Sequence, residues 1–393
     1  MRQIIIVPLV AIFAGLCGPG CCASTNDSVP ALAQSVSDLA PDRSVLELAE
    51  GTYTIGSTWT ISRAGVTIRG AGIGKTILVR DPKFDGVMMK IDAENSTIRD
   101  LTLDGNGTAT VISLNRPGAV ADAIEVKNFG HIGIAVPASD SDCRITKCSI
   151  SGFGNPAIQS IGIWHDTGKI STDATLTIDH SIINNNGMCG IYCTGGKVTI
   201  TNNQLSGNHL ITSPGGGQID IGNAFTTNTV ATITGNTIVD GGSIKAGGIE
   251  LGGGNFTVTN NVIRNHGLAG IGIGHNAIQA TIRGNTVSNS GHYIADNNRP
   301  QNRAGIYVMY GVENVEISGN RCFDDQPSKT QTWGVLLVPP PMRPDPRFSE
   351  RGTKHVVVRE NDLRGNIHSE GLLDQSQAEQ RSISGNFPSQ ANR

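Results

Sequence analysis

The sequence predicts an all-β solenoid, in which short parallel strands coil once per repeat around a shared core. Three observations predict this fold. Glycine accounts for 50 of the 393 residues and aromatic residues for only 4%, which suits short strands and tight turns better than a helical bundle. One asparagine returns in a fixed register from residue 203 to residue 386. The repeats consist of strand-like runs of three to five residues, with Gly and Asn at their joints.

The register is set by the phrase Gly-Ile-x-hydrophobic followed by hydrophobic-x-x-Asn, as in residues 247–267 and 268–291. The shortest spacings, 22 to 25 residues, define the unit, and longer spacings contain an inserted loop. A unit this short cannot bury its own apolar side and has to stack on its neighbours. We expect the asparagines to form a ladder at a corner that needs left-handed backbone and side-chain amide bonds. The positions are Asn203, Asn236, Asn261, Asn285, Asn320, Asn361 and Asn386, preceded by the variants Leu101, Cys148 and Ser181.

Four segments are expected along the chain. Residues 1–23 have one early cation, an apolar run and small residues, as an export signal does. Residues 24–50 are expected to form an N-terminal cap with a short helix, residues 51–387 the solenoid, and residues 388–393 a frayed tail. The mature protein is therefore expected to be extracellular or periplasmic and to lack a transmembrane segment. A lipid anchor on an N-terminal Cys is the alternative to free secretion.

The charge of the chain and the number of its cysteines limit the possible binding partners and the roles of the thiols. The net charge is -3 and no Lys/Arg run exists, which argues against a nucleic-acid partner. We expect a monomer. Five cysteines follow the signal, an odd number without zinc-site spacing, and we interpret them as small buried core residues. They are Cys143, Cys148, Cys189, Cys193 and Cys322.

The repeats resemble those of right-handed parallel β-helix proteins of the pectate-lyase-like superfamily. Residues 45–61 and 65–79 are similar to the opening strands and first coils of that group, and the resemblance covers about residues 30–387. It implies a single-stranded right-handed parallel β-helix with a polysaccharide groove along one sheet. It does not select an activity, because the superfamily includes lyases, hydrolases, epimerases and proteins without known catalysis.

The first strand of each coil is predicted to present a row of outward residues. Inserted loops at 208–217 and 290–305 enter this strand, and loops at 166–175 and 338–355 leave it. Long loops on both sides of one sheet would wall a groove, where binding usually resides. The predicted row is Met88, Glu125, Trp164 (or Gly162, one register earlier), Tyr192, Asp220, Glu250, Gly272, Tyr307 and Leu336, with His165, Gly195, Asn223, Gly253, His275 and Tyr310 at the strand exits.

Asp220 and Glu250 are expected on successive coils, about 4.8 Å apart at their strand positions. Three interpretations remain open. The pair could serve as the nucleophile and acid/base of a retaining glycosidase. It could bind Ca²⁺ against an acidic sugar. It could also be two solvated strand residues.

A second group of candidates could catalyse β-elimination from a uronic acid. His275, Tyr307 and Arg303 come from consecutive coils and could remove the C5 proton and neutralise the carboxylate, with Tyr307 acidified by Arg303 or Lys245. Aromatic and polar side chains of the same face are candidate substrate-binding residues. They are Trp164, His165, Tyr192, Asn223 and Tyr310.

Together these features predict an exported protein that binds and cleaves an extended, acidic polysaccharide, by elimination or by hydrolysis. The alternative is a non-catalytic surface adhesin or envelope protein that uses the same groove to bind polysaccharide.

Overall fold

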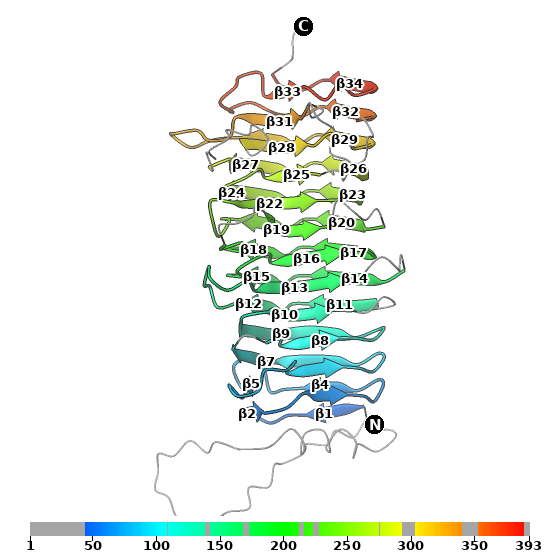
Figure 1. Cartoon of the computed structure of the whole chain (residues 1–393), viewed down its shortest axis with the longest axis vertical. Coiled ribbons are helices and arrows are strands. Elements are labelled where there is room, and N and C mark those ends of the chain that lie inside the picture. Colours follow the sequence, from blue (N-terminus) through cyan, green and yellow to red (C-terminus); the bar gives the residue numbers. More distant parts are fainter. Residues whose placement is uncertain are drawn as a thin grey trace, which may run out of the picture.

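The computed structural model describes residues 44–107, 109–137, 142–167, 173–211, 216–222, 228–274, 276–292, 303–339 and 353–388. In this part of the chain, parallel strands stack coil upon coil into an elongated solenoid (Figure 1). The described residues contain strands and no named helix. The predicted signal, the cap helix and the last residues of the predicted tail lie outside the described residues. The first strand begins at Val45, ahead of the predicted start of the solenoid at residue 51.

Three faces, each built of parallel strands, surround the core. Sheet 1 has twelve strands. They are β3 (Trp59–Ile61), β6 (Met89–Ile91), β8 (Ile112–Leu114), β10 (Ile132–Val136), β13 (Ile161–Asp166), β16 (Ile191–Thr194), β19 (Gly216–Ile221), β22 (Ala246–Leu251), β25 (Ile271–Ile273), β28 (Ala304–Val308), β31 (Trp333–Leu337) and β33 (Leu372–Asp374).

Sheets 2 and 3 follow sheet 1 in each coil and are joined by two long strands, β7 (Thr97–Gly107) and β9 (Val120–Phe129), that run around the corner between them. Sheet 2 also contains β1 (Val45–Glu47), β4 (Thr67–Arg69), β11 (Asp142–Thr146), β14 (Thr175–Asp179), β17 (Lys197–Thr201), β20 (Val230–Thr234), β23 (Gly254–Thr259), β26 (Ala277–Arg283), β29 (Asn314–Ser318), β32 (His355–Arg359) and β34 (Gln380–Ser384). Sheet 3 also contains β2 (Gly51–Ile55), β5 (Thr76–Arg80), β12 (Ser149–Ser151), β15 (Ile182–Asn184), β18 (Gln204–Ser206), β21 (Thr237–Val239), β24 (Val262–His266), β27 (Thr286–Ser290) and β30 (Arg321–Phe323).

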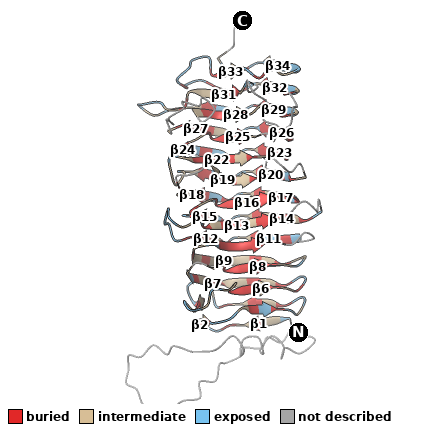
Figure 2. Cartoon of the chain, viewed as in Figure 1, coloured by how far each residue is buried: buried red, intermediate tan, exposed pale blue. Residues whose placement is uncertain are grey.

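The core runs along the inside of the whole stack, and Figure 2 shows the buried residues on every coil. Alternate side chains of a strand point inward because the strand repeat is two residues. In β17, Val198 and Ile200 are buried at 2% and 0% exposure while Thr199 between them is partly exposed. Each coil thus adds a thin layer of Ile, Val or Leu to a continuous core.

The predicted asparagine ladder is confirmed from Asn203 to Asn386. From Asn236 onward, the Oδ1 atom of each asparagine accepts hydrogen bonds from the backbone N–H and the Nδ2 of the asparagine one coil earlier, at 2.8–3.0 Å. Each Nδ2 also donates to a strand carbonyl, as Asn261 does to Ile233 at 2.9 Å. Both polar ends of these buried amides are therefore satisfied, as low-dielectric surroundings require.

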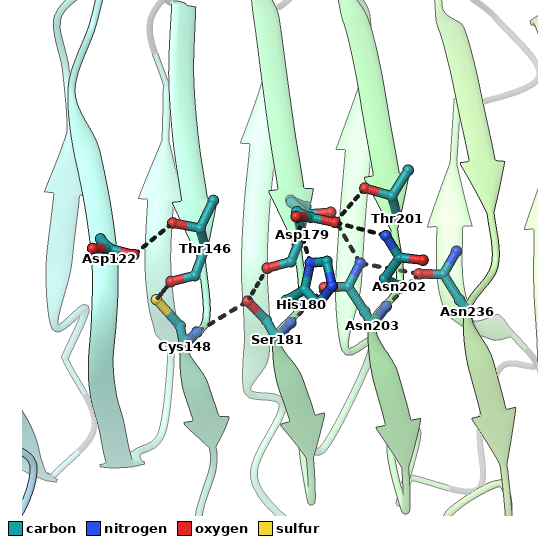
Figure 3. Close-up of polar contacts among 11 residues, drawn as sticks. Asp122, Thr146, Cys148, Asp179, His180, Ser181, Thr201, Asn202, Asn203 and Asn236 are labelled. Atoms are coloured by element: carbon teal, nitrogen blue, oxygen red, sulfur yellow. Dashed lines mark hydrogen bonds and ion pairs between the residues drawn. The ribbon is translucent and has the colours of Figure 1, made fainter.

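The ladder changes composition toward the N-terminus, where Figure 3 shows its first polar steps. Ser181 Oγ accepts from the backbone N–H of Cys148 at 3.1 Å, and Ser181 N–H donates to Asn203 at 2.9 Å. Below Cys148, the register places Ile124 and Leu101 at the same corner. The left-handed backbone expected at the asparagines occurs one residue earlier instead, for example at Asn202 and Asn260, with φ of 55° and 56°. The ladder residue is thereby free to point inward.

A second buried polar ladder, which the sequence analysis did not predict, supports sheet 1 from inside. Asn208 Nδ2 donates to Gln218 Oε1 of β19 at 3.0 Å, and Gln218 Nε2 lies 2.9 Å from His266 Nε2 of β24. Burial lowers the pKa of His266 to about 3, with a further contribution from His292. The imidazole is therefore neutral and its Nε2 accepts the bond from Gln218. This ladder fixes β19 two residues before Asp220.

Candidate functional site

The predicted outward row is confirmed from Trp164 to Tyr307. Parallel register pairs Trp164 with Tyr192, Tyr192 with Asp220, Asp220 with Glu250, Glu250 with Gly272 and Gly272 with Tyr307. One row position per coil of sheet 1 therefore lies above the next, at a strand spacing of about 4.8 Å. Leu336 continues the register but is only 1% exposed.

The predicted start of the row is wrong. Met88 is fully buried, and the register places Lys90, Ser113 and Ala135 in the row below Trp164. Glu125 belongs to β9, where it pairs with Ser149 on sheet 3 and accepts a hydrogen bond from Thr102 at 2.9 Å.

Asp220 and Glu250 lie side by side, as predicted, and both retain intermediate exposure. Burial raises the pKa of Asp220 to about 7. Burial also raises the pKa of Glu250 to about 8, with a hydrogen bond from Tyr307 opposing the rise and the charge of Asp220 adding to it. The pair as a whole therefore exchanges its two protons near neutrality, well above ordinary carboxyl groups.

The carboxyl groups lie over strand positions that carry no side chain. A Cβ at Gly247 would lie 2.9 Å from Glu250 Oε1, and a Cβ at Gly216 would lie 3.5 Å from Asp220 Oδ2. The thiol of Cys189, on the preceding coil, is 4.0 Å from Asp220 Oδ2. Glycine at these positions gives the carboxyl groups room that a larger residue would occupy.

Tyr307 contacts Glu250 across an intervening coil. Its hydroxyl donates a 2.8 Å hydrogen bond to Glu250 Oε2, although the residues are 57 positions apart. Gly272 occupies the row position between them. A Cβ there would overlap Glu250 Oε2 and lie 2.7 Å from both Cε1 and Cζ of the tyrosine ring. The sequence analysis placed both residues in the row but did not predict this contact. The glycine at position 272 was the signal that could have indicated it, because it leaves space between the two side chains.

The expectation that Tyr307 acts as an acidified base is wrong. Burial raises the pKa of Tyr307 well above its usual value, and the charge and hydrogen bond of Glu250 raise it further. Arg303 donates from Nε to the carbonyl of Thr330 at 3.3 Å. Tyr307 is therefore a hydrogen-bond donor to Glu250, and in the predicted trio of His275, Tyr307 and Arg303 the base role of Tyr307 is lost, while the roles of His275 and Arg303 stay predictions.

His165 does not bind substrate on this face, contrary to the prediction. It is 0% exposed and its Nδ1 lies 2.9 Å from the carbonyl oxygen of Val136 inside the solenoid. Burial lowers the pKa of His165. The strand alternation explains the error, because Trp164 points outward and its neighbour has to point inward.

The remaining binding candidates divide into two groups. Trp164, Tyr192 and Tyr310 are described and partly exposed, with the first two adjacent in the row. Burial raises the pKa of Tyr192 to about 12, so its hydroxyl stays protonated at physiological pH. Asn223 and His275 lie outside the described residues, as do large parts of the four inserted loops. The groove walls therefore stay a prediction.

No group of three or more His, Cys, Asp or Glu side chains capable of holding a metal occurs within the described residues. Asp220 and Glu250 alone provide fewer oxygen ligands than the six to eight that Ca²⁺ takes. The five cysteines are free and buried, in agreement with the interpretation as core residues.

Comparisons with known proteins agree with this architecture. A family model described as a right handed beta helix region matches residues 55–205 and 162–326. The chain belongs to the right-handed β-helix family. A comparison of the sequence with curated proteins gives no match. In the described part, no helix has the length and apolar character required to cross a bilayer.

Solved structures share the fold at low sequence identity. The A-module of mannuronan C-5 epimerase AlgE6 from Azotobacter vinelandii has 15% identity and a TM-score of 0.54, covering 88% of this chain and 91% of that chain. A complex of alginate lyase AlyF-OU02 with G6 has 16% identity and a TM-score of 0.54, covering 92% and 84%. The catalytic unit of a GH87 α-1,3-glucanase from Streptomyces thermodiastaticus strain HF3-3 has 12% identity and a TM-score of 0.58, covering 93% and 70%.

Proposed function

We propose that this protein is an exported glycoside hydrolase that cleaves an extended, neutral polysaccharide on sheet 1. The observation that carries the proposal is the in-register pair Asp220 and Glu250, two partly exposed carboxyl groups whose pKa values are raised to about 7 and about 8. Strand positions about 4.8 Å apart on adjacent coils are compatible with the separation of about 5–5.5 Å between the carboxyl groups of retaining glycosidases.

The two carboxyl groups have different surroundings, which suggests different roles. Glu250 receives the Tyr307 hydrogen bond, which orients its carboxyl group, and is assigned as the general acid that donates its proton to the leaving glycosidic oxygen. Asp220 is assigned as the nucleophile that attacks the anomeric carbon as that bond breaks, giving a glycosyl ester. The Glu250 carboxylate then takes a proton from water, which attacks the ester and releases Asp220.

A neutral substrate fits the charges around the pair better than an acidic one. In the part of the chain that the structure describes, Glu250 accepts from the Tyr307 hydroxyl and Asp220 lies 4.0 Å from the Cys189 thiol, and neither partner is a cation. Arg303 is bonded through Nε to the carbonyl of Thr330. Elimination from a uronic acid needs a group that neutralises the sugar carboxylate, and two carboxyl groups would repel that sugar. The fold itself does not decide, since similar structures include uronate-modifying enzymes and a glucanase.

A non-catalytic polysaccharide-binding protein is the second candidate. The adjacent aromatic residues Trp164 and Tyr192 favour it, because amphipathic rings on a surface bind sugars whether or not a bond is cleaved. Export, and its lipid-anchored variant, rest on residues 1–23 and stay proposals, as does the monomeric state.

Product analysis on purified mature protein tests the proposal. The substrates are neutral glucans, xylan and mannan, with pectate and alginate as acidic comparisons, with and without Ca²⁺. We expect new reducing ends from a neutral glycan without the ultraviolet absorbance of an unsaturated product. Unsaturated products from pectate or alginate would instead establish elimination, and binding without products would establish the second candidate.

Variants of the pair test the assignment of residues. Asp220→Asn and Glu250→Gln should each lower kcat at least about 100-fold, in the range typical of lost acid, base or nucleophile function. Glu125→Gln is the matched control, because Glu125 is a partly exposed carboxylate on another sheet. Full activity in both site variants would refute the role of the pair.

A further inference from the structure

Aromatic rings lie on both sides of the carboxyl pair. Tyr192 is one coil before Asp220 in the row. Tyr307 is two coils after Glu250, but its ring lies back over Gly272 and so occupies the coil directly next to Glu250. The order along sheet 1 is therefore ring, carboxyl, carboxyl, ring, at intervals of about one strand spacing.

We propose that Tyr192 and Tyr307 are paired sugar-binding platforms, about three strand spacings apart, that hold sugars of one chain on the two sides of the cleaved bond, and that Gly272 makes the Tyr307 platform possible. The proposal rests on the proposed hydrolysis for its reaction and extends it to a substrate class. That class is a neutral glycan that is bound and cleaved within its chain rather than at its end. The apolar faces of its sugar rings stack on aromatic side chains.

Gly272 makes the second platform possible. Any side chain at this position would meet the Tyr307 ring and the Glu250 carboxyl group at once. The ring would have to leave the coil next to Glu250, and its hydroxyl would lose the 2.8 Å hydrogen bond to Oε2. One missing side chain thus lets a single tyrosine serve two purposes, ring stacking and orientation of Glu250.

The two purposes of Tyr307 are separable by substitution. Tyr307→Phe keeps the ring and removes the donor, whereas Tyr307→Ala removes both. The hydrogen bond from Tyr307 lowers the pKa of Glu250, so Tyr307→Phe should raise that pKa further. The general acid then stays protonated to higher pH, and the basic limb of the kcat/KM profile should move upward.

The experiment compares Tyr192→Ala, Tyr307→Ala, Tyr307→Phe and Gly272→Ala with wild type on neutral hexasaccharides. We expect KM to rise about tenfold in Tyr192→Ala and Tyr307→Ala, the order of magnitude of one lost aromatic contact. Gly272→Ala should resemble Tyr307→Ala. Tyr307→Phe should leave KM unchanged and move the basic limb of the kcat/KM profile to higher pH. Phe153→Ala is the control, because Phe153 is an aromatic residue 40% exposed between sheets 3 and 1.

Two outcomes separate this inference from the proposed function. If wild type cleaves a neutral glycan but KM is unchanged in Tyr192→Ala and Tyr307→Ala, the platforms are refuted while the hydrolase stands. If wild type cleaves nothing, hexasaccharide binding is measured by calorimetry on the same variants. Loss of binding in both alanine variants would support the platforms alone, and equal binding or no binding by wild type would refute them. Circular dichroism identifies any variant that fails to fold. If an alanine variant does not fold, Tyr307→Phe, which removes only one oxygen atom, still tests the role of the Tyr307 hydroxyl.

Discussion

At the residue scale, the raised pKa values of Asp220 and Glu250 make the stability of the fold depend on pH. Each would ionise at a lower pH in the unfolded chain, where the ordinary pKa values are 3.8 and 4.5. The folded protein therefore holds more protons than the unfolded chain between about pH 4 and pH 8. In this interval a rise in pH ionises groups that the fold disfavours, and the free energy of unfolding should fall.

Removing one of these groups should weaken that dependence. We expect Asp220→Asn to be similar to wild type near pH 4 and more stable relative to wild type near pH 8, because the asparagine carries no charge to desolvate or repel. Urea unfolding at several pH values measures the effect. Asp362→Asn should change the stability in the opposite direction. A hydrogen bond from Arg364 lowers the pKa of Asp362, so the ionised Asp362 stabilises the fold and its removal should lower the free energy of unfolding at neutral pH. A steeper pH dependence in Asp220→Asn would contradict the raised pKa.

The asparagine ladder acts at the scale of the strand and its corner. Each member bonds the coil before it and is bonded by the coil after it, so the ladder fixes the register between sheets 2 and 3. The same register places Asp220 and Glu250 in line on sheet 1, because a slip of one residue would turn the outward row into the core. The ladder thus supports the candidate site without contacting it.

Asn261→Ala should be strongly destabilising. The substitution leaves the backbone N–H of Asn236 without its acceptor and removes the Asn261 amide from the carbonyl of Ile233. It also removes one acceptor of Asn236 Nδ2, which keeps the carbonyls of Ile200 and Thr234. Each buried group left unpaired costs about 1–3 kcal/mol, so we expect a loss of about 3–5 kcal/mol in the free energy of unfolding. Gln204→Ala, at an exposed position directly after a ladder residue, should change it by less than about 0.5 kcal/mol. Urea titrations of both variants measure the free energy of unfolding. Equal losses in the two variants would show that the ladder hydrogen bonds do not contribute this stability.

At the scale of the whole molecule, sequence reasoning succeeded where the repeat carries its own marker. Asparagine marks the corner from Asn203 onward, and the row residues from Tyr192 to Tyr307 in those coils were assigned correctly. Leu101, Ile124 and Cys148 occupy the same corner without that marker, and there Met88 and Glu125 were assigned to the wrong face. The bond between Tyr307 and Glu250 could not be predicted, because it depends on a side-chain conformation that reaches across a coil rather than on the repeat.

A solenoid also distributes stability along one dimension, since the strands of each coil pair only with those of the neighbouring coils. Interior coils have ladder bonds on both sides, whereas β34 pairs within the described residues only with β32, and four of its five side chains are exposed. Local opening there breaks fewer bonds than opening at β20, which pairs with both β17 and β23. We therefore expect amide hydrogens of Gln380–Ser384 to exchange much faster than those of Val230–Thr234, which should approach the global free energy of unfolding. Hydrogen exchange followed by mass spectrometry measures both segments in one experiment. Equal protection would mean that the stack opens as one cooperative unit, and the site on sheet 1 would then share its stability with every coil.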